Sequence, residues 1–168
     1  DRQVKVRNLV EVAHTTAAFY EKEAKEGRMT MDEAKKGAMG AIRNMRYDKV
    51  EYFWINDLKD EMVMHPIKTE LDGKDLSGVK DPNGFPLFNE FVAKVRKDGK
   101  GFVAYQWPKP GKDNPVEKLS YVQGFEPWGW VVGSGIYVGD VREAAQRQVA
   151  WMAAIVAAAL LLAGYLFI

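Results

Sequence analysis

The sequence has no cysteine and only two histidines in 168 residues. The absence of cysteine excludes disulfide bonds, thiolate zinc sites, iron–sulfur clusters and thiol nucleophiles. With only His14 and His65 to supply imidazole, we expect no metal site. The sequence also lacks an excess of one charge sign, since 24 basic and 23 acidic side chains leave a formal net charge of +1. Nucleic acid is therefore not an expected partner, because domains that bind it usually carry a basic stripe or patch.

The sequence does contain enough apolar material for one folded domain. The chain has a mass of 19.0 kDa, and 47% of its residues are hydrophobic while 28% are charged. This size suits a single ordinary domain, and this composition is not that of a disordered chain.

Residues 149–168 (VAWMAAIVAAALLLAGYLFI) form an apolar run without a charged side chain. A helix of this length spans about 30 Å, which matches the hydrocarbon core of a bilayer. Trp151 and Tyr165 lie near its two ends, where membrane-interface aromatics are usually found. We predict a transmembrane helix here. The alternative is a buried core helix, which needs a larger protein around it.

Two helices are expected within residues 1–45, before the rest of the domain. Residues 1–26 carry apolar or small side chains at alternating steps of four and three, beginning at Val6, which is a helical pattern. Thr30 and Glu33 have the spacing of a capping box and predict the start of the second helix.

The apolar pattern changes to a period of two after Arg46, which predicts a sheet region over residues 46–138. The expected strands are residues 50–55, a run ending at His65, 102–107, 116–125 and 130–138, with a short helix near 88–95. Short turns connect the last three strands and favour antiparallel neighbours. The predicted fold class is α+β, with five antiparallel strands and helices on one face.

Little in the sequence favours an enzyme. Nucleophilic catalysis needs a nucleophile beside a base and an orienting group, and no G-x-S-x-G turn occurs. Gly133 and Gly135 flank Ser134, but they lie within a strand pattern rather than before a helix. We interpret them as glycines that allow close backbone approach. We expect no catalytic activity and no cofactor.

Cationic and aromatic side chains recur in the predicted strands and favour a binding site. They are Arg46, Tyr52, Trp54, His65, Tyr105, Trp107, Lys118 and Tyr121. A core can use the rings, but burial of a cation is costly unless an anion compensates it. Each residue has an ordinary alternative, such as a helix-end salt bridge for Arg46 or contact with water for Lys118. Together they predict a pocket for a small carboxylate, which cations and tyrosine hydroxyls bind well.

Several separated motifs resemble, in order, those of the single Cache domain. They are RYD at 46–48, YFWIND at 52–57, MHP at 64–66, LDGKDL at 71–76, GFVAYQWPKPG at 101–111, KLSY at 118–121 and WGWVVGSGIY at 128–137. The resemblance covers residues 1–148. It implies a PAS-like fold with a long N-terminal helix and a five-stranded antiparallel sheet.

The same resemblance implies a function. Single Cache domains are extracytoplasmic sensors of bacterial transmembrane receptors, above all methyl-accepting chemotaxis proteins. The resemblance implies a homodimer in the cell membrane that binds acetate, propionate, lactate or pyruvate through the cationic and aromatic residues named above. We expect the anion to gather Arg46, His65 and Lys118, and to bias the strand that leads into the membrane helix.

Two alternatives remain open at this point. The same sensor could belong to a histidine kinase or a diguanylate cyclase. The domain could also be a membrane-tethered module whose aromatic face binds a protein.

Overall fold

The computed structural model describes residues 2–166, without the side chains of residues 140–144 and 159–166. The chain divides into two units, Asp1–Ile136 and Tyr137–Ile168. The elements are α1 (Arg2–Lys25), α2 (Met31–Asn44), β1 (Arg46–Tyr47), β2 (Glu51–Asp57), β3 (Met62–Met64), η1 (Thr69–Leu71), α3 (Leu87–Asp98), β4 (Lys100–Pro108), β5 (Pro115–Phe125), η2 (Glu126–Trp128), β6 (Trp130–Tyr137) and α4 (Val138–Leu166).

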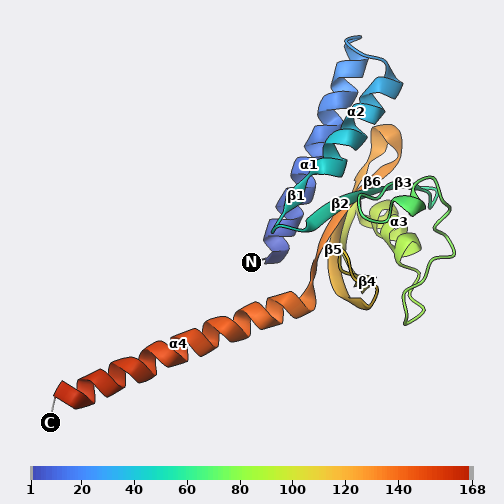
Figure 1. Ribbon diagram of the computed structural model, residues 1–168. Helices are drawn as coiled ribbons and strands as arrows, with labels where there is room; N and C mark the ends of the chain where they lie inside the picture. The colour runs from blue at the N-terminus through green and yellow to red at the C-terminus, as the bar shows by residue number, and fades with distance from the viewer. Residues whose placement is uncertain (1, 167–168) are drawn as a thin grey trace. The chain divides into compact units, whose positions relative to one another are not determined.

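The two N-terminal helices form where the sequence predicts them and lie side by side (Figure 1). The second begins at the predicted capping box. The Glu33 amide donates to Thr30 Oγ1 at 3.1 Å, and the Thr30 amide donates to Glu33 Oε2 at 2.8 Å. Gly37 lets the helices approach closely, because a Cβ there would lie 2.9 Å from Cδ1 of Tyr20.

The sheet has six strands in the order β1-β2-β6-β5-β4, with β3 also paired to β2. The prediction of five strands is therefore wrong by one strand. The additional strand is β1, which pairs antiparallel with β2 so that Arg46 lies opposite Tyr52. Asp48 and Lys49 turn the chain between them with φ values of 45° and 74°. Asp48 is a residue type that tolerates this conformation but Lys49 is not, so the sequence signal for the turn is weak.

Helices cover both faces of the sheet, and the expectation of helices on one face is also wrong. On one face, His14 of α1 contacts the ring of Phe125 in β5. On the other, Phe91 of α3 contacts the ring of Tyr105, which lies opposite Lys118 of β5. Residues 118 and 125 face opposite ways in one strand. The helices α1 and α2 therefore lie on one side of the sheet and α3 on the other (Figure 1).

The predicted C-terminal transmembrane helix, residues 149–168, falls on α4 as far as Leu166. Residues 159–168 lie outside the part of the chain whose side chains are described. Among the described residues, no helix has the length and apolar character that a membrane crossing requires. The predicted span is therefore not found in the described structure.

Candidate functional site

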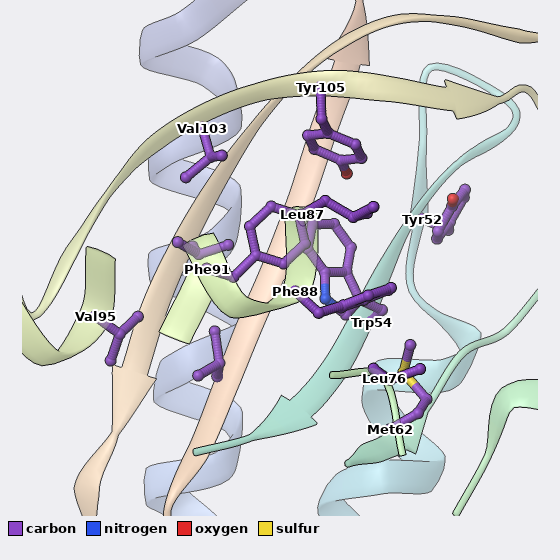
Figure 2. Close-up of a cluster of buried hydrophobic side chains, with 12 residues drawn as sticks. Tyr52, Trp54, Met62, Leu76, Leu87, Phe88, Phe91, Val95, Val103 and Tyr105 are labelled. Atoms are coloured by element: carbon purple, nitrogen blue, oxygen red, sulfur yellow. The ribbon is translucent and has the colours of Figure 1, made fainter. Parts of the chain in front are cut away.

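The candidate site lies on the α3 face of the sheet. Strand alternation places Tyr52 and Trp54 of β2 on this face, and the register of β4 with β5 places Tyr105 opposite Lys118. Helix α3 covers these residues with its apolar side. Figure 2 shows the rings of Tyr52, Trp54 and Tyr105 around the side chains that α3 contributes.

These side chains enclose a small space, which we call the inner cavity. Its walls are Tyr52, Trp54, His65, Leu87, Phe88, Phe91, Tyr105 and Trp107. The cavity volume is about 10 Å³, which is room for about one water molecule. The site as it stands is therefore too small for an organic acid.

Lys118 is a buried cation beside this cavity, with 1% of its surface exposed. Its Nζ donates a hydrogen bond to the Tyr52 hydroxyl at 3.1 Å. The same atom lies 4.3 Å from the centroid of the Tyr52 ring and 5.6 Å from that of Trp54. Aromatic faces attract a cation, so the rings compensate part of the cost of its burial.

The two glycines of β6 make room for these side chains. A Cβ at Gly135 would overlap Ser120 Oγ and lie 3.0 Å from Cε of Lys118. A Cβ at Gly133 would lie 2.6 Å from Cη2 of Trp54. The interpretation that these glycines allow close approach is confirmed.

The imidazole ring of His65 is neutral, and its Nε2–H can donate a hydrogen bond. Its Nδ1 accepts hydrogen bonds from the amides of Ile67 at 3.2 Å and Lys68 at 2.9 Å. An acceptor nitrogen carries no proton, so the ring proton is on Nε2. Burial, followed by the positive charges of Lys118, Lys68 and Arg43, lowers the pKa of His65 to about 3. His65 is 2% exposed, and its ring lies 5.0 Å from that of Tyr52.

A second layer of polar contacts holds this wall in place. The His65 amide donates to Asp72 Oδ1 at 2.6 Å, and Asp72 pairs with Arg43 at 2.7 Å. Across the cavity, the Tyr105 hydroxyl lies 2.9 Å from Ser120 Oγ. Burial raises the pKa of the Tyr105 hydroxyl well above its ordinary value, so it is protonated at neutral pH.

The structure brings most of the predicted site residues together. Tyr52, Trp54, His65, Tyr105 and Trp107 line the cavity, and Lys118 contacts its wall through the Tyr52 hydroxyl. Arg46 does not join them: it is exposed, and its Nη1 donates to the carbonyls of Arg43 at 2.7 Å and Met45 at 2.8 Å. Tyr121 does not join them either, because it lies opposite Phe102 and packs on its ring, on the other face of the sheet.

Several residues of the site were not predicted. Leu87, Phe88 and Phe91 supply its apolar wall from α3. Phe88 and Phe91 were recognised only as part of the apolar face of a short helix, and Leu87 was not singled out. Arg43 and Asp72 are far apart in sequence, and no local pattern connects them. The spacing of three between Lys118 and Tyr121 within one strand was a usable signal that they face opposite ways.

The arrangement separates polar and apolar walls. Lys118, the Tyr52 hydroxyl and the Nε2–H of His65 offer hydrogen-bond donors with positive charge nearby. Leu87, Phe88 and Phe91 offer an apolar surface. Such a site favours an anionic group at one end of a molecule and an apolar group at the other.

Comparison with known proteins gives a consistent result. Residues 1–151 match the single Cache domain 2 family. The chain is 46% identical over 144 residues to the methyl-accepting chemotaxis protein McpP of Pseudomonas putida, covering 86% of this chain and 26% of that protein. It is 30% identical over 142 residues to the sensor histidine kinase MctS of Rhizobium johnstonii, covering 83% and 30%. The chain thus spans less than a third of the length of these relatives.

Solved structures are similar over most of the chain. A periplasmic sensor domain of a chemotaxis protein has a TM-score of 0.81 and 56% identity, covering 82% of this chain and 95% of that one. A Cache chemosensory domain studied for its recognition of carboxylic acids has a TM-score of 0.80 and 47% identity, covering 82% and 93%. A methyl-accepting chemotaxis protein of Vibrio parahaemolyticus has a TM-score of 0.72 and 27% identity, covering 83% and 90%.

Proposed function

Because the chain belongs to the single Cache domain 2 family, we propose that it is the ligand-binding region of a bacterial chemoreceptor for a small carboxylic acid. The observation that carries this proposal is the buried Lys118 ammonium, which lies beside the donor wall of the inner cavity. Two similarities support it: the 46% identity to a chemotaxis protein and the 47% identity to a Cache domain that recognises carboxylic acids.

The electrostatics of the site favour a carboxylate. Burial lowers the pKa of His65 most, and the positive charges of Lys118, Lys68 and Arg43 lower it further. A carboxylate bound there reduces this positive potential and accepts charge-assisted hydrogen bonds from Lys118, which are about twice as strong as neutral ones. The Tyr52 hydroxyl accepts from Lys118 and keeps its own proton for a ligand.

The dimensions of the site favour a short acid with one carboxylate. The inner cavity has almost no free volume, so even a small acid must displace side chains as it binds. A second carboxylate on the ligand would meet Leu87 and Phe91, where burial of an unpaired charge is costly. We therefore assign the ligand to the C2–C4 monocarboxylates, such as acetate, propionate, lactate and pyruvate. For the four heavy atoms of acetate, the maximum binding energy of about 6 kcal/mol corresponds to about 40 μM.

The receptor context follows from the relatives. We place residues 1–148 outside the cytoplasmic membrane, as in the periplasmic sensor domain with 56% identity. Chemotaxis is the proposed output because McpP is the more similar relative. A histidine kinase is the second candidate, since MctS is 30% identical over nearly the same length of chain.

We also propose that two chains pair through α1. Val12 and Phe19 are 57% and 56% exposed although both are large and apolar, and they are spaced seven residues apart. Thr16 between them and Leu9 before them are half-buried and complete a stripe with steps of three and four. This is the spacing of a helix-pairing surface. Sedimentation of Phe19→Glu beside the unsubstituted chain tests it: we expect dimers to be lost in the variant.

Calorimetric titration with a panel of ligands tests the proposed function. We expect heat from acetate, propionate, lactate and pyruvate, and none from propionamide, which has the shape of propionate without its charge. Lys118→Met should abolish binding, because truncation of a buried charge partner costs about 2–5 kcal/mol. Arg46→Ala is the matched control and should bind as the original protein does, since Arg46 lies outside the site. Silence across the whole panel would favour a protein-binding module instead.

A further inference from the structure

The size of the inner cavity restricts how a ligand can enter the site. The inner cavity of about 10 Å³ admits no carboxylic acid until one of its walls moves. Two larger hollows on the surface each share a wall with it. One, of about 590 Å³, shares Tyr105. The other, of about 300 Å³, shares Tyr52 and Trp107, and we call it the outer hollow.

The wall at Tyr105 is firmly held. The Tyr105 hydroxyl is bonded to Ser120 Oγ at 2.9 Å within the sheet. The segment in front of it is fixed by the Asp81 carboxylate, which accepts hydrogen bonds from the amides of Asn83 at 2.8 Å and Phe85 at 3.0 Å. The same carboxylate also accepts from the Gln106 amide of β4 at 3.0 Å. Movement of this wall requires several hydrogen bonds to break together.

The wall at Trp107 is held more weakly. Trp107 is half-buried and lies one residue before the end of β4. The next pair in the ladder joins Pro108 to Pro115, and neither proline has an amide hydrogen to donate. The indole ring has no side-chain hydrogen bond among those described and meets His65, Phe88 and Tyr105 only through ring contacts, at centroid distances of 6.0, 5.9 and 6.5 Å.

The outer hollow is lined by more positive than negative charge. Lys68, Lys109 and Lys112 lie around it together with Glu70 and Asp113. The Nζ of Lys68, at the wall of the outer hollow, lies 5.7 Å from the centroid of the Trp107 ring, which the hollow shares with the inner cavity. A small anion is therefore attracted to the point where the wall is weakest.

We propose that the outer hollow is the entry site for the organic anion, that Lys68 receives its carboxylate there, and that the Trp107 side chain is the gate to the inner cavity. This inference rests on the proposed function, because it concerns the route by which the same ligand arrives. It assigns Trp107 a role in the rates of binding and release, beyond its place in the cavity wall.

Two substitutions test the gate, Trp107, and the receiving charge, Lys68, separately. Trp107→Ala removes the gate, and we expect the rate constants for association and dissociation both to rise by about tenfold, because binding no longer waits for a side chain to move. Lys68→Gln leaves the gate and removes the charge. We expect association to slow by about threefold at low salt and the difference to disappear at about 0.5 M salt, where exposed charges are screened.

The rates are measured on the ligand, so that no tryptophan is needed as a reporter. Line shapes of ¹³C-labelled propionate give the dissociation rate constant, calorimetry gives Kd, and the two together give the association rate constant. Lys36→Gln is the charge control, since Lys36 lies on α2 and pairs with Asp32. Phe85→Ala is the route control, because it widens the 590 Å³ groove at the other wall. Both controls should bind and release propionate at the original rates.

The outcomes distinguish this inference from the function on which it rests. If Trp107→Ala binds propionate with unchanged rates, or if Phe85→Ala accelerates binding instead, the entry route is wrong while the carboxylate sensor stands. If Lys68→Gln and Lys36→Gln have the same association rate at low salt, Lys68 does not receive the ligand. If the unsubstituted protein binds no acid at all, the proposed function is overturned and this route with it.

Discussion

The buried neutral state of His65 makes the stability of the domain depend on pH. The folded protein holds the pKa of His65 at about 3, against 6.5 for the unperturbed side chain, chiefly through burial. Below pH 6.5 the unfolded chain therefore binds a proton that the folded chain does not. Stability falls as pH falls through this range, and the loss ends only near pH 3. Over the whole window the shift corresponds to about 5 kcal/mol.

Between pH 7 and pH 5 the expected loss is about 2 kcal/mol from His65 alone. His65→Asn is the comparison, because its Oδ1 can accept from the amides of Ile67 and Lys68 as Nδ1 does, but it does not titrate. Burial also lowers the pKa of His14, but His14 is present in both proteins and its effect cancels. The difference in pH dependence between the two proteins therefore reports on His65.

Urea unfolding at the two pH values measures this difference. The buffers must contain no carboxylate, since acetate or citrate could occupy the site and stabilise the folded state. We expect the original protein to lose about 2 kcal/mol more than His65→Asn between pH 7 and pH 5. Equal losses in the two proteins would refute the reasoning, and so would an NMR titration in which His65 of the folded protein ionises near pH 6.5.

Two further predictions concern the scaffold of the site. Gly135→Ala should destabilise the protein by about 2–4 kcal/mol in urea unfolding, because the added Cβ overlaps Ser120 Oγ and lies 2.8 Å from the Leu119 carbonyl oxygen. Gly40→Ala in α2, where a Cβ meets nothing within 4 Å, should instead stabilise the protein by about 0.5–1 kcal/mol. A loss of stability at Gly40 as large as at Gly135 would contradict this account. Asp81→Ala should lower the free energy of unfolding by about 2–4 kcal/mol, since three backbone amides lose their acceptor. Amide hydrogen exchange should become faster at residues 81–86. Unchanged exchange there would show that the carboxylate does not hold the segment.

Much of the fold could be predicted because local patterns determine it. The capping box at Thr30 and Glu33 fixes the start of α2 with a recognised pair of hydrogen bonds. The alternation around Tyr52 and Trp54 sets the buried faces of β2. By contrast, β1 depends on a turn at residues 48–49 that has no glycine, and Asp48 alone is a weak local signal for it.

The site was predictable only in part, because its residues meet through tertiary contacts. Lys118 and Tyr105 come together through strand register, which the short connection between β4 and β5 makes predictable. Arg46 was expected to meet the anion, but the chain turns directly after it and its guanidinium caps the carbonyls at the end of α2. Arg43 acts on His65 instead, together with its partner Asp72. Which of the two arginines acts on His65 depends on where α2 ends relative to the loop that contains Asp72.

The position of helix α3 is the other feature that the sequence left open. Its apolar side at Leu87, Phe88 and Phe91 was recognisable, but the face of the sheet that it covers was not. An amphipathic helix can pack on either face, and the choice depends on the long connection before it. This choice decides whether Trp54 and Tyr105 face an apolar wall or solvent, and so whether an enclosed cavity forms.

The most direct test is a crystal structure of the protein with propionate. A carboxylate within hydrogen-bond distance of Lys118 Nζ and His65 Nε2, with the ethyl group against Leu87 and Phe91, is the result we predict. Density for propionate only beside Arg46, or only at the protein surface with the inner cavity still closed, would contradict it.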